Sequence, residues 1–277
     1  MTRFIVGVDG SRGGEAALRW ATRLAVASDA EIVAVNAYER RYSEMPPDML
    51  EQELADREQL LSAEWTRPAV EAGVRVHTEV HERDPRDMID RACDDAALVV
   101  LGRTGNGTEP GVFHLGSVVE HVAHHCPVPL AVIQPHGSER VERIVVGVDG
   151  SGESSAAIRW CATHAGRFQA DVLAVQVGQT EQQPKGPHDW RVSTEVEIGR
   201  WTEPIASAGH EVTPLAIRGL RPAEALVGIA AEGPPSLLVI GTRGTGGFLG
   251  LRVGGVAMKV LHRATTDLVL VPPAPRG

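Results

Sequence analysis

A glycine-rich segment in the second half of the chain has the residue types that bind phosphate. It runs from Gly241 to Val256 and contains seven glycines. Because glycine lacks a Cβ atom, successive backbone N–H groups can converge on phosphate oxygens. A helix beginning near Gly254 would point its positive end at the same anion, and Arg243, Arg252 and Lys259 add positive charge. A connector without a ligand is the alternative, since neither the Walker A sequence nor the G-x-G-x-x-G fingerprint occurs.

A second motif, Asp-Gly-Ser, occurs twice, as Asp9–Ser11 and as Asp149–Ser151. Each copy lies where an apolar, strand-like run ends and a helical segment begins. Gly10 and Gly150 permit a tight turn, and the serines can cap the helix by accepting a backbone N–H bond. The aspartates would offer a carboxylate to ribose hydroxyls or to the adenine amine. A turn that only caps a helix explains the same residues, so the motif alone leaves both interpretations open.

The histidine-rich segment Glu120–Cys126 has some features of a metal site. His121 and His125 are four residues apart, on one helical face, and Cys126 follows. A zinc site needs three or four convergent ligands, however, and the corresponding segment Lys259–Ala264 does not keep the histidine group. We therefore expect no metal site. No G-x-S-x-G nucleophile elbow occurs either, and we expect no catalytic residues.

The chain contains an internal duplication. Arg3–Ser11 matches Arg143–Ser151, and Gly102–Gly105 matches Gly241–Gly244 further along. Copies of this length are too long for solenoid repeats, so the duplication predicts two domains, residues 1–137 and residues 138–277. A short polar segment with Pro and Gly joins them.

Short β-branched runs alternate with helical segments in each copy. The continuous apolar character of the runs is typical of parallel strands covered by helices on both faces, and the alternation implies βαβ units. We predict an α/β fold, with a doubly wound five-stranded parallel sheet in each copy and ligands beyond the carboxyl ends of the strands, where strand order reverses. The predicted strands are Phe4–Val8, Glu31–Asn36, Val74–Val80, Leu98–Leu101, Leu130–Ile133, Ile144–Val148, Asp171–Val177, Glu211–Ile217, Leu237–Ile240 and Leu268–Val271. The helices predicted in the first copy are Glu15–Ala27, Pro47–Ala72, Pro85–Asp95 and Gly116–His125, and Trp20 and Trp160 are predicted core residues.

The composition excludes several classes of protein. The 277 residues include 27 Lys and Arg against 36 Asp and Glu, a net charge of −9, and the whole excess lies in residues 1–137. This balance argues against broad binding to nucleic acid or to an anionic membrane. No apolar run is long enough for a transmembrane helix, no signal-peptide pattern opens the chain, and three widely spaced cysteines are typical of a reducing compartment. We expect a cytoplasmic location.

Together these motifs resemble the universal stress protein family in its tandem form, over nearly the whole chain. ATP-binding members of that family carry the loop G-x2-G-x9-G-Ser/Thr and an Asp at the end of strand one. The resemblance implies a Rossmann-like fold of the adenine nucleotide alpha hydrolase type. It implies that the ribose or adenine meets Asp9, Gly10, Asp149 and Gly150, and that Ala37 and Val177 line the adenine pocket. By the same likeness, phosphates would lie against Gly102, Gly105, Gly116, Ser117 and Val118 in the first copy, and against Gly241, Arg243, Gly244, Gly254, Gly255 and Val256 in the second.

Each copy departs from the family's loop. In the first, ten residues instead of nine separate Gly105 from Gly116, and Glu109 and Pro110 lie between them. In the second the spacing is intact, but Gly255 replaces the hydroxyl residue. One hydrogen bond to a charged group is worth about 1.5–3 kcal/mol, and misplacing several backbone donors should cost more. We therefore expect the second copy to bind ATP more tightly.

The resemblance implies an ATP-binding regulatory protein of the stress response, with Mg²⁺ accompanying the nucleotide. Nucleotide occupancy would control its conformation or its partners, with little or slow hydrolysis and no other enzymatic activity. The alternative is an interaction scaffold of the same fold that binds no nucleotide. The sequence does not identify the protein partners, and it is compatible with a homodimer.

Overall fold

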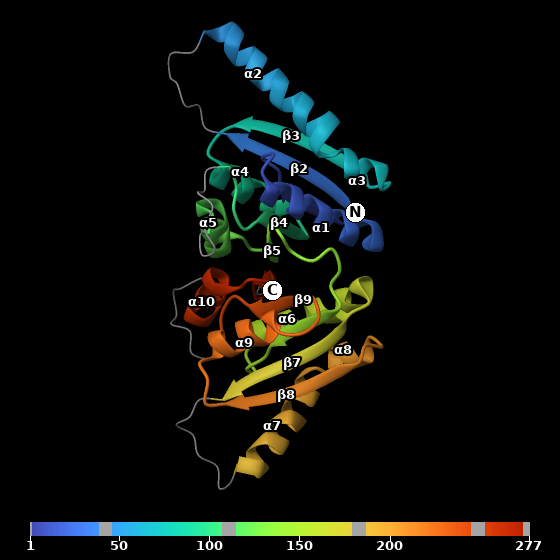
Figure 1. Ribbon diagram of the computed structural model, residues 1–277, viewed down its shortest axis with the longest axis vertical. Helices are drawn as coiled ribbons and strands as arrows, with labels where there is room; N and C mark the ends of the chain where they lie inside the picture. The colour runs from blue at the N-terminus through green and yellow to red at the C-terminus, as the bar shows by residue number, and fades with distance from the viewer. Residues whose placement is uncertain (1, 39–45, 107–114, 179–186, 245–252, 274–277) are drawn as a thin grey trace. The chain divides into compact units, whose positions relative to one another are not determined.

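The computed structural model describes residues 2–38, 46–106, 115–178, 187–244 and 253–273 (Figure 1). The chain divides into two compact units, Met1–Gly137 and Ser138–Gly277, here called unit 1 and unit 2. Three residues of the sequence argument, Glu109, Pro110 and Arg252, lie outside the described residues.

Unit 1 contains a sheet of parallel strands. Their spatial order is β3 (Val76–Glu82), β2 (Glu31–Tyr38), β1 (Arg3–Gly7), β4 (Leu98–Gly102) and β5 (Leu130–Ile133). β1 pairs on both sides, so that Ile5 lies opposite Val33 in β2 and opposite Val99 in β4. Chain order therefore reverses between β1 and β4, the position where doubly wound sheets bind ligands.

Helices pack on the sheet of unit 1. α1 (Arg12–Ser28) contacts β1, β2 and β4, while α4 (Pro85–Ala92) contacts β2 and α5 (Ser117–His125). α4 is shorter than the predicted helix Pro85–Asp95, because the chain tightens into a 3₁₀ turn over Cys93–Asp95.

The single helix predicted over Pro47–Ala72 is wrong. The structure has α2 (Pro47–Gln59), a wider π-helical turn over Leu60–Trp65, and a separate short helix α3 (Arg67–Glu71). Pro68 occupies the first turn of α3, where a missing N–H does no harm, but it cannot continue a preceding helix. The buried Thr66 hydroxyl donates to the carbonyl of Leu61 at 2.7 Å and fixes the break.

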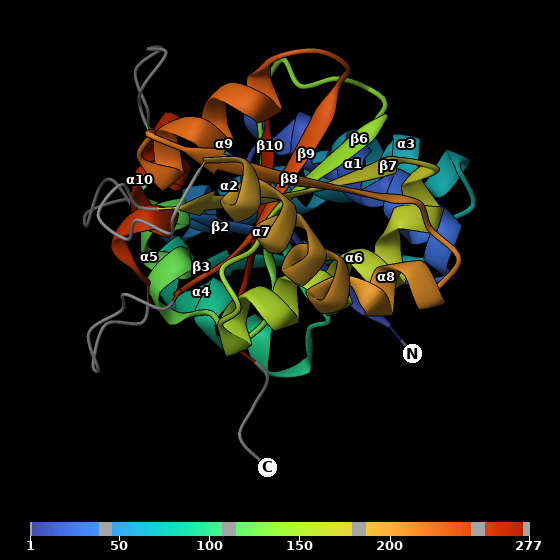
Figure 2. The same ribbon diagram turned by 90° about the horizontal axis from the view of Figure 1, so that it is seen from below.

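Unit 2 repeats the arrangement. Its strand order is β8 (Val212–Arg218), β7 (Asp171–Gly178), β6 (Arg143–Gly147), β9 (Ser236–Gly241) and β10 (Asp267–Val271), all parallel. Its helices are α6 (Gly152–Phe168), α7 (Pro187–Trp201), α8 (Glu203–Ser207), α9 (Pro222–Ala231) and α10 (Gly255–Arg263). Both α6 and α9 contact β6 and β9, and Figure 2 shows them on opposite faces of the sheet. The predicted doubly wound α/β fold is confirmed in both units.

Aliphatic side chains of the central strands form the core of each unit. All of Leu130–Ile133 and all of Asp267–Val271 are buried, which explains why these runs lack in–out alternation. Trp20 is 1% exposed and Trp160 is 7% exposed, so their prediction as core residues is confirmed. In the part of the chain that the structure describes, no helix is long and apolar enough to cross a membrane.

Candidate functional site

The Asp-Gly-Ser turns lie at the carboxyl ends of β1 and β6, beside the reversal of strand order. Ser11 caps α1 by accepting from the Gly14 N–H at 3.1 Å, and Ser151 caps α6 in the same way. Gly10 adopts a φ of +76°, a conformation that side chains disfavour, and this explains the glycine between the aspartate and the serine. The predicted capping role of the serines is confirmed.

Asp9 ties this turn to the loop that follows β4. Its Oδ1 accepts from the backbone N–H of Ser11 at 3.0 Å and from the Ser11 hydroxyl at 2.5 Å. Its Oδ2 accepts from the backbone N–H of Asn106 at 2.8 Å, and the Asn106 amide donates to the Asp9 carbonyl. The carboxylate therefore has a structural role in unit 1.

The glycines after the fourth strand of each unit make room for these carboxylates. A Cβ atom on Gly105 would lie 2.6 Å from Asp9 Oδ2, and a Cβ atom on Gly244 would overlap Asp149 Oδ2. The structure thus brings together the predicted site residues Asp9 with Gly105, and Asp149 with Gly244.

The described ends of each predicted phosphate loop are joined by a backbone hydrogen bond at the start of a helix. The Gly116 N–H donates to the Arg103 carbonyl at 2.9 Å, and the Gly254 N–H donates to the Thr242 carbonyl at 2.7 Å. α5 then begins at Ser117 and α10 at Gly255, and no side chain of the described residues caps either helix. The helices that follow β1 and β6, α1 and α6, are capped by serines. Of these four helices, α5 and α10 are therefore the two whose starts no described side chain caps.

These open helix starts carry the predicted residues Ser117, Val118, Gly255 and Val256. The first backbone N–H groups of a helix have no partner within the helix and form an anion-binding position with the helix dipole. Among the described residues, a Cβ atom on Gly255 would meet no atom within 4 Å, so they leave the start of α10 open. Both units therefore present backbone donors next to an Asp-Gly-Ser turn.

Gly102 and Gly241 serve a different purpose in the structure. A Cβ atom on Gly102 would lie 2.7 Å from the Cα atom of Gly13, and one on Gly241 would lie 2.8 Å from the backbone of Glu153. These glycines allow the first turn of α1 and of α6 to pack directly on the neighbouring strand. Their contact with phosphate stays a prediction.

The predicted adenine side of each site lies at the ends of β2 and β7. Ala37 and Val177 are half-buried there, and in unit 1 the neighbouring Asn36 amide donates to the carbonyl of Val8 at 2.7 Å. This bond holds the ends of β1 and β2 together, so Ala37 lies on the same edge as the Asp9 turn.

Beside this edge, each unit stacks an arginine on an aromatic ring. In unit 1 the Arg57 guanidinium lies 4.0 Å from the centre of the Tyr38 ring, and in unit 2 Arg218 lies 3.9 Å from the centre of the Trp190 ring. The ring comes from a strand in unit 1 and from helix α7 in unit 2. No sequence match links the two pairs, and the sequence analysis did not identify them.

A tryptophan packs on each Asp-Gly-Ser turn. A Cβ atom on Gly10 would lie 2.6 Å from Trp65, and one on Gly150 would lie 2.8 Å from Trp201. The sequence analysis missed both, although the repeated pattern Trp-Thr-x-Pro, at Trp65–Pro68 and at Trp201–Pro204, was a usable signal.

The charges near the loops differ from the sequence-based expectation. Arg243 pairs with Glu153 Oε1 at 3.1 Å, so its positive charge is partly neutralised within unit 2. Arg103 of unit 1 is only 4% exposed, and burial lowers the pKa of its guanidinium. Lys259 is exposed on α10. Charge therefore favours unit 2 less than the sequence suggested.

Two buried polar atoms at the loop of unit 2 have no hydrogen-bond partner among the described residues. They are the Thr242 hydroxyl oxygen, on a residue that is 6% exposed, and the Arg243 Nε. An unpaired buried polar atom costs about 1–3 kcal/mol. Such atoms fit a site in which a polar ligand supplies the missing partner.

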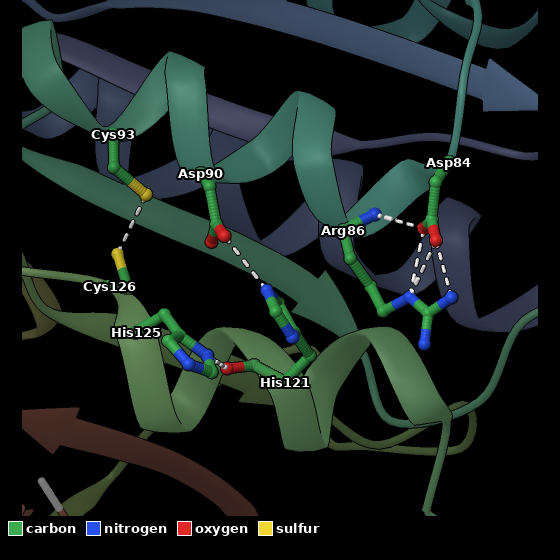
Figure 3. Close-up of polar contacts among 7 residues, drawn as sticks. All are labelled: Asp84, Arg86, Asp90, Cys93, His121, His125 and Cys126. Atoms are coloured by element: carbon green, nitrogen blue, oxygen red, sulfur yellow. Dashed lines mark hydrogen bonds and ion pairs between the residues drawn. The ribbon is translucent and has the colours of Figure 1, made fainter.

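The histidine segment lies apart from this arrangement, on α5 and its end (Figure 3). His121 Nε2 lies 2.8 Å from Asp90 Oδ2 of α4, and the rings of His121 and His125 stack with centres 4.2 Å apart. Cys126 lies 2.9 Å from Cys93, sulfur to sulfur. Within the described residues no three His, Cys, Asp or Glu side chains are grouped to hold a metal ion.

The fold and the paired loops define a duplicated α/β protein of the doubly wound class. The sequence profile of the universal stress protein family matches residues 1–134 and again residues 140–272. The chain therefore belongs to the universal stress protein family, with two family domains.

Relatives and solved structures agree with this assignment. A universal stress protein of Mycobacterium tuberculosis H37Rv is 27% identical over 290 residues, covering 96% of this chain and 95% of the relative. One of Mycolicibacterium smegmatis is 27% identical over 292 residues, covering 97% and 96%. The crystal structure of a universal stress protein from Archaeoglobus fulgidus shares the fold, with a TM-score of 0.74, 18% identity and 98% coverage of both chains.

Proposed function

We propose that this universal stress protein binds adenine nucleotide, ATP with Mg²⁺ in the first instance, and acts as a regulatory protein rather than as an enzyme. The observation that carries the proposal occurs in both units: beside an Asp-Gly-Ser turn, at the reversal of strand order, a helix begins that no side chain of the described residues caps. This edge of a doubly wound sheet is the usual ligand position.

The residues of the chain have distinct tasks in this proposal. Backbone N–H groups at Ser117 and Val118, and at Gly255 and Val256, would donate to phosphate oxygens, because helix dipoles and open N–H groups favour anions there. The Ser117 hydroxyl would add a donor in unit 1. In unit 2 the Thr242 hydroxyl and Arg243 Nε, which find no partner among the residues that the structure describes, support the fit of a polar ligand.

The nucleoside would lie towards the ends of β2 and β7. Ala37 and Val177 offer small or aliphatic surface there, and the Asp149 carboxylate offers an acceptor to ribose or adenine. Bound ATP would bring a polyanion and a flat aromatic ring into the site, with Mg²⁺ offsetting part of the triphosphate charge. Occupancy would then change the loops after β4 and β9 and, through them, the surface offered to partner proteins.

The test uses a charge change at the open helix starts. In the variant Ser117→Asp with Gly255→Asp, a carboxylate at the first helical position favours the helix dipole but repels a phosphate. We expect the affinity for Mg-ATP, measured by isothermal titration calorimetry, to fall at least about tenfold, which is about 1.4 kcal/mol. Native mass spectrometry of the wild-type protein should also detect co-purified nucleotide.

The matched control is the double variant Ser117→Asn with Gly255→Asn, which has the same shape without the charge. The Asp variant should bind Mg-ATP at least about tenfold more weakly than this control, and circular dichroism should show all variants folded. If folded wild-type protein binds no ATP, ADP or AMP, the proposal fails and the scaffold without nucleotide is the better description.

A further inference from the structure

The two cysteines at the ends of α4 and α5 lie close enough to react with one another. Cys93 follows α4, Cys126 follows α5, and their sulfur atoms are 2.9 Å apart (Figure 3). A disulfide bond measures about 2.05 Å, so bond formation requires the sulfurs to approach by only about 0.9 Å. Both thiols are free in the structure.

The two thiols are not equivalent. Cys93 is completely buried, whereas Cys126 is half-buried and accessible from outside. The hydrogen bond from Cys93 lowers the pKa of Cys126, as does a backbone N–H bond from Val128, although burial opposes them. The same sulfur–sulfur hydrogen bond, together with burial, raises the pKa of Cys93. Cys126 is therefore the thiol that loses its proton more readily, and Cys93 is the thiol that keeps it.

The pair belongs to unit 1 alone. The position of unit 2 that matches Cys126 is the buried Ala264, and the third cysteine, Cys161, is buried within α6. Burial raises the pKa of the Cys161 thiol, which makes it unreactive. The duplicated chain thus has one pair of neighbouring thiols and one shielded cysteine that serves as an internal reference.

We propose that Cys93 and Cys126 form a reversible disulfide in unit 1 when the protein meets hydrogen peroxide. The Cys126 sulfur attacks a peroxide oxygen, the O–O bond breaks, and a sulfenic acid forms while the leaving oxygen takes up a proton as water. The Cys93 sulfur then attacks the Cys126 sulfur, the S–O bond breaks, and the departing hydroxide takes the Cys93 proton as a second water. Two thiols lose two electrons and two protons, and one hydrogen peroxide is reduced to two waters.

The disulfide would fasten α4 to α5. The two helices are already joined by the pair Asp90–His121, at 2.8 Å, one turn before the cysteines. Cys93 and Cys126 are 33 residues apart in the chain, and a cross-link across a loop of this length restricts the unfolded state considerably. Oxidation should therefore stabilise unit 1 against unfolding, and this inference does not depend on nucleotide binding.

The experiment treats the reduced full-length protein with hydrogen peroxide and maps its thiols by alkylation and mass spectrometry. We expect two of the three thiols to be lost, with Cys161 still free, and a non-reduced digest to contain Cys93 linked to Cys126 within one chain. Dithiothreitol should restore all thiols. The Tm of the oxidised protein should be several degrees higher than that of the reduced protein.

Single substitutions separate the two steps. Cys161→Ala is the matched control and should oxidise as the wild type does. Cys93→Ala should stop at the Cys126 sulfenic acid, which dimedone captures, and Cys126→Ser should leave Cys93 reduced. If a variant at the buried Cys93 fails to fold, the thiol mapping of the oxidised wild-type protein still tests the proposal by itself. Peroxide that leaves all three thiols free, or links them only between chains, would overturn the proposal.

Discussion

The substitution Asp9→Asn tests whether the Asp9 carboxylate holds unit 1 together. Asp9 accepts from Ser11 N–H, from the Ser11 hydroxyl and from Asn106 N–H. An asparagine at this position could keep its amide oxygen on Ser11, but its NH2 group would then face the Asn106 N–H, donor against donor. One bond is lost outright and the other two lose the assistance of the negative charge.

The magnitude follows from the count of bonds. A hydrogen bond to a charged group is worth about 1.5–3 kcal/mol, and neutral bonds are roughly half as strong. Because Asp9 is half-buried, water recovers part of the loss. We expect the free energy of unfolding of unit 1 to fall by about 2 kcal/mol, measured by urea denaturation of the full chain.

The control is Asp94→Asn, which removes the same charge from an exposed position. It should change the stability by less than about 0.5 kcal/mol. If Asp9→Asn is as stable as this control yet loses ATP affinity, then the carboxylate serves a ligand and the structural role argued here is refuted.

Four further substitutions test three other features of the structure. Gly102→Ala places a Cβ atom against the backbone of Gly13 and should destabilise the protein by about 3 kcal/mol or more. Gly199→Ala lies on an exposed face of α7 and should stabilise the protein by about 0.5–1 kcal/mol. Thermal denaturation compares the two variants. Gly255→Ser adds the hydroxyl that unit 2 lacks and should tighten ATP binding about tenfold by calorimetry, because one bond to a phosphate is worth about 1.5 kcal/mol or more. Burial lowers the pKa of His164 to about 4, so between that pH and about 6.5 the unfolded chain binds a proton that the folded chain does not. The free energy of unfolding should therefore fall by up to about 3 kcal/mol as the pH drops through this window. Denaturation at several pH values should show that His164→Phe removes this part of the pH dependence.

Each of these expectations has a result that contradicts it. Gly102→Ala with wild-type stability would show that α1 can shift away from β4. A Gly255→Ala variant that tightens ATP binding as much as Gly255→Ser would assign the gain to backbone stiffening instead of the hydroxyl. An unchanged pH dependence in His164→Phe, compared with a variant at the exposed His136, would show that His164 titrates alike in both states.

The strands were predictable because their signal is local. Runs such as Leu130–Ile133 are short, β-branched and bounded by polar or proline residues, and all predicted strands agree with the structure within two residues. The break in the helix after Gln59 was less visible. It depends on Pro68 and on Trp65, whose ring packs on Gly10 more than fifty residues earlier in the chain.

Electrostatic pairing was the part of the site that residue types could not predict. Arg243 looked like a free cation beside a glycine loop, yet Glu153 reaches it from the first turn of α6. The matching position in unit 1 is Gly13, which has no side chain to offer. The two units thus use the same backbone contact between a helix and a strand, but only unit 2 adds a carboxylate there.

The tryptophans on the two turns give each candidate site its own optical reporter. Trp65 lies against Gly10 in unit 1 and Trp201 lies against Gly150 in unit 2, whereas Trp20 and Trp160 are in the cores. The fifth indole, Trp190, stacks on Arg218 beside the unit 2 site, so Trp190→Phe is the starting background. In that background an event at one turn should change the emission of one indole and leave the core indoles constant. With Trp65→Phe in one sample and Trp201→Phe in another, fluorescence would follow the two halves of the unlabelled chain separately, and differences between duplicated domains become directly measurable.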